Sequence, residues 1–199
     1  QGVAQDDEQA VKWSRKAAQQ EFAQAEYNLG TMYYNGQGVS QDYEQAVKWY
    51  RKAAEQGYAS AQYNLGVMYR TGEGVHLDSE KAIKWYRKAA EQGHAQAQNN
   101  FGAMHETGEG VPQDHGKAVK WYRKAAEQGY AYAQDNLGDM YETGEGVPQD
   151  YVRAHMWFNL AAAKGMSSAR KNRDIVANRM TQDQIAEAQK LAREWKPKQ

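Results

Sequence analysis

The 199-residue chain contains no cysteine, which excludes disulfide bonds, a thiolate nucleophile and a cysteine-ligated zinc site. It has only 3 prolines, and its glycines gather in short clusters between alanine-, lysine- and glutamine-rich segments, which favour helices. Its 25 basic and 25 acidic residues cancel, so no excess charge draws it to nucleic acid or to an anionic membrane. No apolar run approaches the ~18 residues of a membrane span.

A repeat of 36 residues organises the chain, because three residue types recur at that spacing. The series are Trp13, Trp49, Trp85, Trp121 and Trp157; Gly30, Gly66, Gly102 and Gly138; and Asp6, Asp42, Asp78, Asp114 and Asp150.

Each unit predicts two helices. In the first helix of the second full unit, residues 61–69, apolar residues fall on one face. Gly66 lies in mid-helix, where glycine costs about 1 kcal/mol relative to alanine. We therefore expect the backbone of a neighbouring helix to approach it too closely for a Cβ. Residues 71–75, Thr-Gly-Glu-Gly-Val, predict the turn that ends this helix.

The second helix of each unit is predicted to begin at an aspartate N-cap, Asp42 or an equivalent from the aspartate series. Gln45 is placed to complete a capping box with Asp42. The predicted buried side of this helix contains Ala46, Trp49, Tyr50, Ala53 and Ala54. The predicted C-terminal glycines are Gly57, Gly93, Gly129 and Gly165. The first unit has Glu21 at this position, so we expect a strained or different turn there.

The sequence thus predicts an all-α solenoid, in which stacked helix pairs share one core. A single domain, 1–199, is expected to contain a partial first unit and link (1–24), four full units (25–165) and an atypical end (166–199). Because the partial unit lacks its first helix, we expect exposed apolar surface near Trp13. At the other end, Thr181 and Gln184 predict a capping box before an amphipathic capping helix. The chain begins with Gln1 and shows no signal peptide, which leaves a further N-terminal segment open.

The pattern Ala-x-x-x-Leu-Gly-x-Met-Tyr-x-x-Gly-x-Gly-Val-x-x-Asp, followed by Ala-Ile-Lys-Trp-Tyr-x-Lys-Ala-Ala-x-x-Gly, spans residues 61–93. It resembles the Sel1-like repeat. The resemblance implies a right-handed α-solenoid of antiparallel helix pairs, related to tetratricopeptide repeats, that acts as a bacterial protein–protein adaptor. It also favours a periplasmic or secreted location over the cytoplasm. Cysteine-rich relatives are linked to penicillin binding, but this chain has none of their cysteines.

Some columns of the first helices vary between units while the scaffold positions are copied. These columns fall on one helical face, and in the tetratricopeptide relatives the corresponding face lines a concave groove. We call these residues the binding stripe: Tyr27, Thr31, Tyr34, Tyr63, Val67, Arg70, Asn99, Glu106, Tyr132, Asp135, Asp139 and Glu142. The stripe is neutral and aromatic in the first full unit and acidic in the fourth. The expected partner is a protein or extended peptide that is basic where it meets the acidic part.

The recurring asparagines, Asn28, Asn64, Asn100, Asn136 and Asn172, are peptide ligands or structural groups that satisfy a loop or helix terminus. The sequence favours the structural role. The recurrent Gly-x-Gly turns lack the strand and third glycine of a dinucleotide site. The histidines, His76, His94, His105, His115 and His155, lack metal-ligand spacing. Residues 168–171 match S-x-x-K without its companion motifs.

The second helices also present a basic ladder, of which Arg51 is expected to pair with Glu55 one turn away. This pairing argues against nucleic-acid binding. We therefore expect a binding scaffold, not an enzyme, without cofactor or metal. Two alternatives stay open: a cell-wall-directed activity, penicillin-binding or hydrolase-like, and self-assembly through the incomplete N-terminal unit.

Overall fold

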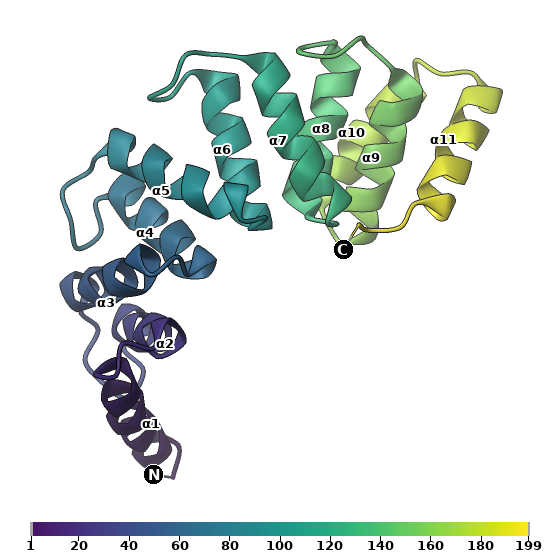
Figure 1. Cartoon of the computed structure of the whole chain (residues 1–199). Coiled ribbons are helices and arrows are strands. Elements are labelled where there is room, and N and C mark those ends of the chain that lie inside the picture. The colour runs from purple at the N-terminus through teal and green to yellow at the C-terminus, as the bar shows by residue number, and fades with distance from the viewer. Residues whose placement is uncertain (1, 199) are drawn as a thin grey trace. The chain divides into compact units, whose positions relative to one another are not determined.

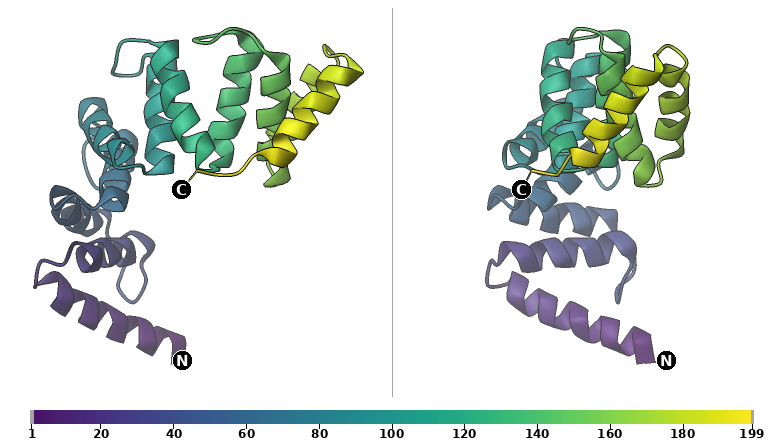
Figure 2. Two further views of the ribbon diagram at one scale, coloured as in Figure 1. Left: turned by 45° about the vertical axis from the view of Figure 1, so that its right-hand side comes forward. Right: turned by 90° about the vertical axis from the view of Figure 1, so that its right-hand side faces the viewer.

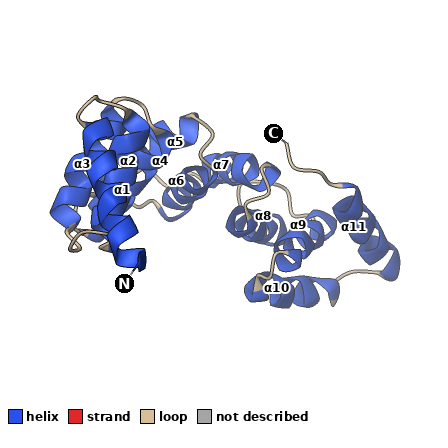
Figure 3. Cartoon of the chain, turned by 90° about the horizontal axis from the view of Figure 1, so that it is seen from below, coloured by secondary structure: helices blue, strands red, loops and turns tan. Residues whose placement is uncertain are grey.

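The computed structural model describes residues 2–198, and this part of the chain contains eleven helices and no strand (Figures 1 and 3). The helices are α1 (Gly2–Ala18), α2 (Ala23–Asn35), α3 (Tyr43–Glu55), α4 (Ala59–Thr71), α5 (Ser79–Glu91), α6 (Ala95–Thr107), α7 (His115–Glu127), α8 (Ala131–Thr143), α9 (Tyr151–Ala163), α10 (Ser167–Ala177) and α11 (Gln182–Glu194). We call α2, α4, α6 and α8 the A-helices, and α3, α5, α7 and α9 the B-helices. The predicted all-α class and two-helix units are confirmed.

The chain divides into two compact units, residues 1–94 and 95–199. In unit 1, α2 packs against α1 and α3, and α4 packs against α3 and α5 (Figure 2). In unit 2, α6 to α9 each pack against the next helix, and α11 packs against α9. Consecutive helices therefore stack as a solenoid within each unit. The assignment of residues 1–199 to a single domain stays a prediction.

The four full B-helices begin at the predicted caps. The side chains of Asp42, Asp78, Asp114 and Asp150 each accept a hydrogen bond from the backbone N–H three residues ahead, over 2.8 to 3.0 Å. At Asp42 this bond comes from Gln45 and supplies one half of the predicted box. The complete capping box forms at Thr181 with Gln184. The extension of the series to Asp6 is wrong: α1 begins at Gly2, so Asp6 lies inside the helix.

The B-helix ends follow the predicted pattern. Gly57 has φ +92°, its N–H donates to the carbonyl of Ala54, and the N–H of Tyr58 donates to that of Ala53. These two bonds define a Schellman motif. Glu21 takes the same place in the partial first repeat, with φ +60°. A side chain there is strained by about 1 to 2 kcal/mol, as the sequence predicts.

The core of each helix pair centres on the residue that follows the repeated tryptophan. Tyr50, Tyr86, Tyr122 and Phe158 are at most 1% exposed. Each ring lies against the mid-helix glycine of its paired A-helix: a Cβ on Gly138 would be 2.5 Å from Cε1 of Phe158. The closest atoms are therefore those of an aromatic ring. The predicted approach of a neighbouring helix backbone is also seen, because a Cβ on Gly66 would lie 3.3 Å from the carbonyl oxygen of Ala82.

The two ends differ in how their apolar surface is covered. Trp13 is 65% exposed on α1, which confirms the expected apolar surface, and Phe22 after it is 58% exposed. At the other end, α11 buries Ala188 and Ala192, and the ring of Trp195 lies 6.2 Å from that of Trp157 on α9. The α11 helix thus covers the side of α9, as a capping helix does.

Candidate protein-binding surface

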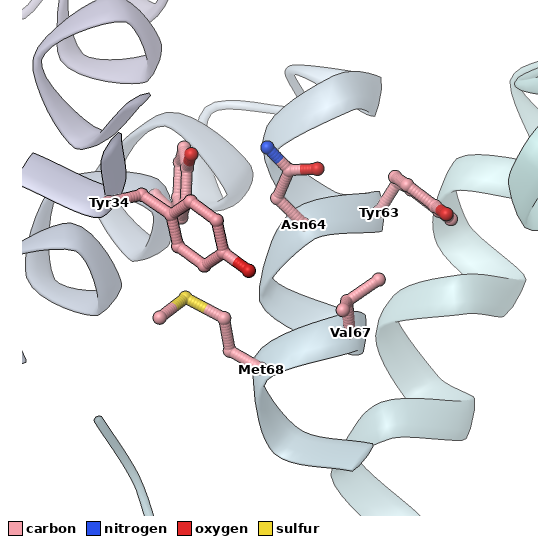
Figure 4. A pocket seen from close by; sticks show the side chains of 6 residues that line it. Tyr34, Tyr63, Asn64, Val67 and Met68 are labelled. Carbon is pink, nitrogen blue, oxygen red and sulfur yellow. The ribbon is translucent and has the colours of Figure 1, made fainter. Parts of the chain in front are cut away.

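Three residues of the binding stripe line one pocket in unit 1. Tyr34 from α2 lines this pocket together with Tyr63 and Val67 from α4, and the pocket holds about 180 Å³ (Figure 4). Tyr50, Asn64 and Met68 complete its lining. Tyr50 and Met68 are each 1% exposed, so they form its buried floor. Stripe residues from two neighbouring A-helices thus line one concave site.

Neighbouring side chains fix the walls of this pocket. The Tyr34 hydroxyl donates to Oε2 of Glu73 over 3.1 Å, and its ring lies 5.2 Å from that of Tyr43. The ring of Tyr63 stacks on His94 at 4.8 Å and tilts against Tyr86 at 5.8 Å. A binding partner would therefore meet rings that are already held in position.

The other stripe residues of unit 1 lie outside the pocket. The ring of Tyr27 lies 5.0 Å from that of Tyr58 and 5.7 Å from that of Tyr50. The Thr31 hydroxyl accepts a hydrogen bond from the Tyr50 hydroxyl over 3.2 Å and donates to the carbonyl of Tyr27 over 3.1 Å. Arg70 is exposed near the end of α4. Thr31 thus supports the floor, whereas Arg70 is open to solvent.

In unit 2 the stripe brings four carboxylates together: Glu106 on α6, and Asp135, Asp139 and Glu142 on α8. Burial, followed in order by the carboxylates of Asp135, Glu142 and Glu106, raises the pKa of Asp139 from 3.8 to about 7. Burial also raises the pKa of Asp135. The stripe therefore carries negative charge at a cost in stability, because buried like charges repel.

Side chains of α10 and its following turn contact this acidic cluster. Ser168 donates to Asp135 over 3.0 Å, and Asn172 donates to Asp135 and Asp139 over 3.4 and 3.3 Å. Nη1 of Arg179 lies 3.2 Å from Oε1 of Glu142. The stripe prediction missed these contacts, although the 36-residue asparagine series already pointed to Asn172.

The remaining stripe residues of unit 2 differ in exposure. Asn99 is 9% exposed and accepts a hydrogen bond from Nδ2 of Asn136 over 3.0 Å. Tyr132 is 59% exposed, and its ring lies 5.6 Å from that of Tyr130. Tyr132 is therefore available to a partner, whereas Asn99 is largely engaged within the fold.

At Asn136 and Asn172 the structural role that the sequence favours is seen, but with other partners than predicted. Asn136 and Asn172 donate to side chains of the preceding A-helix, as described above, and Asn64 lines the pocket of unit 1. The prediction that these amides satisfy a loop or helix terminus was wrong. They lie one residue after a stripe column and therefore face the neighbouring A-helix at the same surface.

The basic ladder is also held differently from the prediction. Arg51 donates to the hydroxyl of Tyr69 over 2.8 Å, where the sequence predicted a pair with Glu55. Its neighbour Lys52 lies over the ring of Trp49, with Nζ 4.8 Å from the ring centroid. Among the described residues, no three or more histidine, aspartate or glutamate side chains are arranged so that they could hold a metal ion, and no helix is long and apolar enough to cross a membrane.

Replacing Asp139 by asparagine is expected to stabilise the protein most at high pH. The folded pKa of about 7 exceeds the ordinary value of 3.8, so the stability tied to the neutral carboxyl is complete below pH 3.8 and is lost as the pH rises through 7. After allowance for partial exposure, Asp139→Asn should add about 1 to 2 kcal/mol at pH 8. Urea unfolding between pH 5 and 8 measures this gain, with Glu109→Gln in an exposed turn as the control. A gain that does not grow with pH would contradict the assignment.

Comparison with known families adds to this geometry. The family model of the Sel1 repeat matches residues 1–22, 23–58, 59–94, 95–130 and 131–166. The chain belongs to the Sel1 repeat family. In the full units, each Sel1 repeat contains one A-helix and the B-helix that follows it. Sel1 repeat proteins generally act as scaffolds for protein interactions, and their fold is typically non-enzymatic.

Solved structures include other Sel1 repeat proteins. One from Oxalobacter formigenes is 42% identical, with a TM-score of 0.78; the match covers 83% of this chain and 48% of that one, so this chain spans about half its length. Cysteine rich protein B from Helicobacter pylori is 24% identical, with a TM-score of 0.53 and coverage of 66% and 94%. Immunity protein Pa5087 from Pseudomonas aeruginosa is 23% identical, with a TM-score of 0.56 and coverage of 92% and 72%. These last two show the fold alone. A search of curated proteins gave no match.

Proposed function

We propose that this Sel1 repeat protein binds a partner protein or extended peptide on the binding stripe of its A-helices. One observation carries the proposal: three residues chosen because they vary between repeats, Tyr34, Tyr63 and Val67, line a single preformed pocket. Tyrosines in a concave site are typical anchors of protein interfaces, because each ring offers a large apolar contact area and a polar end.

The two parts of the stripe favour different partner chemistry. In unit 1 the pocket contains no charged side chain, which suits an apolar or aromatic group. In unit 2 the acidic cluster of Glu106, Asp135, Asp139 and Glu142 suits lysine or arginine, because opposite charges speed association and exclude wrong partners. A partner basic toward the unit 2 part would also relieve the repulsion that raises the pKa of Asp139.

A crosslinking pull-down with matched variants tests the proposal. Tyr63→Ala and the double change Asp135→Lys with Asp139→Lys should each reduce capture of the same protein by roughly tenfold or more, because the stripe loses an anchor or reverses its charge. The neutral pair Asp135→Asn and Asp139→Asn should give a smaller loss. Circular dichroism confirms that each variant folds.

The control for this experiment changes the basic ladder instead. Lys84→Ala and Lys120→Ala alter exposed side chains of the B-helices and should leave capture unchanged. If the B-helix variants lose the partner and the stripe variants keep it, the stripe is not the binding surface. Capture lost only with Trp13→Ala would favour the second candidate, self-association at the exposed end of α1.

A further inference from the structure

The residues that line the pocket of unit 1 have equivalent positions two repeats later, within unit 2. The positions 72 residues after Tyr34, Tyr63 and Val67 are Glu106, Asp135 and Asp139. The other three lining positions keep their residue types, as Tyr122, Asn136 and Met140. The same scaffold thus carries three apolar or aromatic side chains in unit 1 and three carboxylates in unit 2. The three wall positions can therefore change their chemistry while the rest of the lining keeps its residue types.

The unit 1 pocket is sized for one ring. A cavity of about 150 Å³ between apolar side chains binds benzene in another protein, and this pocket holds about 180 Å³. Its walls offer tyrosine rings, and the thioether of Met68 lies in the floor. Aromatic groups pack favourably against both, in tilted ring pairs and sulfur–ring contacts.

A cationic side chain fits this pocket less well. None of the six lining residues carries a carboxylate, and the carboxylate of Glu73, outside the lining, already accepts a hydrogen bond from the Tyr34 hydroxyl. Attraction between an ammonium group and tyrosine rings is modest, whereas stripping its water is costly without a paired charge. The pocket therefore discriminates in favour of an uncharged ring.

We propose that the pocket between α2 and α4 is the anchor site for one phenylalanine side chain of the partner. The inference rests on the proposed function, since it names the group that enters the stripe in unit 1. The ring enters between Tyr34 and Val67 and packs over Tyr50 and Met68. The amide of Asn64 at the same pocket offers a donor and an acceptor to the backbone of the partner segment.

The test uses N-acetyl-L-phenylalanine N-methylamide as a probe, followed by ¹H–¹⁵N NMR on the full chain. We expect saturable shifts at the side-chain amide of Asn64 and the backbone amides of Val67 and Met68, with a dissociation constant on the order of 1 mM for so small a ligand. The leucine analogue should bind more weakly, and the lysine analogue should leave these signals unchanged. Equal shifts with lysine, or none with phenylalanine, would overturn the proposal.

Two kinds of variant sharpen the result. Tyr63→Asp with Val67→Asp copies the residues of unit 2 and should weaken phenylalanine binding by roughly tenfold or more. Val67→Phe fills the space with an apolar ring and should block the probe without adding charge. Arg70→Gln, on α4 but outside the pocket, is the matched control and should bind normally. Unchanged probe binding in Val67→Phe would place the probe elsewhere.

This test separates the two proposals. Probe binding in the pocket is measured without a partner, so it can succeed even if the stripe variants capture the same proteins as the native chain. That result would reject the proposed function and keep the pocket. If the stripe variants lose the partner but the phenylalanine probe does not bind the pocket, only the proposed phenylalanine anchor is rejected.

Discussion

Replacing Phe158 by alanine should lower the free energy of unfolding by about 3 to 5 kcal/mol. Its ring is fully buried on α9 and packs over Gly138 of α8. Removing the ring leaves a cavity between the two helices of one repeat, which the alanine-rich surroundings cannot fill. Urea unfolding followed by circular dichroism measures the loss.

The double-mutant cycle with Gly138→Ala identifies the contact. In the native background the new Cβ would lie 2.5 Å from the Phe158 ring, and such overpacking costs about 1 to 3 kcal/mol. In the Phe158→Ala background the same change should stabilise α8 by up to about 1 kcal/mol, since alanine favours a helix more than glycine does. Gly116→Ala is the control, because its nearest contact would be an oxygen of Asp114 at 3.4 Å. Equal effects of Gly138→Ala in both backgrounds would show that the ring is not the reason for the glycine.

Gly74→Ala is expected to destabilise unit 1 by about 2 to 4 kcal/mol. Gly74 has φ +67°, and a Cβ there would lie 2.4 Å from the carbonyl carbon and oxygen of Tyr43. These atoms belong to the first turn of α3, which the Asp42 cap holds in place. The backbone therefore cannot yield without disturbing the start of the helix, and urea unfolding measures the cost.

Gly57→Ala separates the two causes of this loss. Gly57 also has a positive φ, +92°, but no atom lies within 4 Å of the position of its Cβ. Alanine there should cost only the conformational strain, about 1 to 2 kcal/mol. If both variants lose the same stability, the contact of the turn with α3 contributes nothing measurable.

The sequence predicts the fold well because its local signals agree with one another. Aspartate caps, glycine at helix ends and apolar faces all repeat with the same period, so each copy supports the others. Asp6 shows the limit of this reasoning. In the partial first repeat, α1 begins at Gly2 and runs on through the position where the other copies begin their B-helix.

Contacts between helices were harder to predict. The mid-helix glycine signals a close neighbour, but spacing along the chain cannot say whether a ring or a backbone approaches. The asparagines show the same difficulty, since their partners are stripe residues 37 positions away, such as Asn99 for Asn136. Only the stacking of successive A-helices brings these side chains together.

The sequence places the variable columns on one helical face, whereas the binding of a partner there stays a prediction. The electrostatics of these positions could not be predicted, because the pKa of Asp139 depends on burial and on Glu106, which belongs to another helix. Nor does the sequence reveal that Tyr50, a core residue of a B-helix, forms the floor of the unit 1 pocket. The floor of this pocket comes from core residues, whereas its walls come from the A-helix positions that vary between repeats.

This division separates constant from variable positions, both in the pocket of unit 1 and at the matching positions 72 residues later in unit 2. The floor tyrosine and the asparagine keep their residue types: they are Tyr50 and Asn64 in the pocket of unit 1, and Tyr122 and Asn136 at the equivalent positions of unit 2. The three wall positions vary: they are tyrosine, tyrosine and valine in unit 1, and glutamate, aspartate and aspartate in unit 2. Since the wall positions differ while the floor tyrosine and the asparagine are kept, a substitution in one repeat can change the chemistry of its wall and leave the other repeats as they are. Under the proposed function, the number of repeats sets how many such wall positions a partner meets, and substitutions change them one repeat at a time.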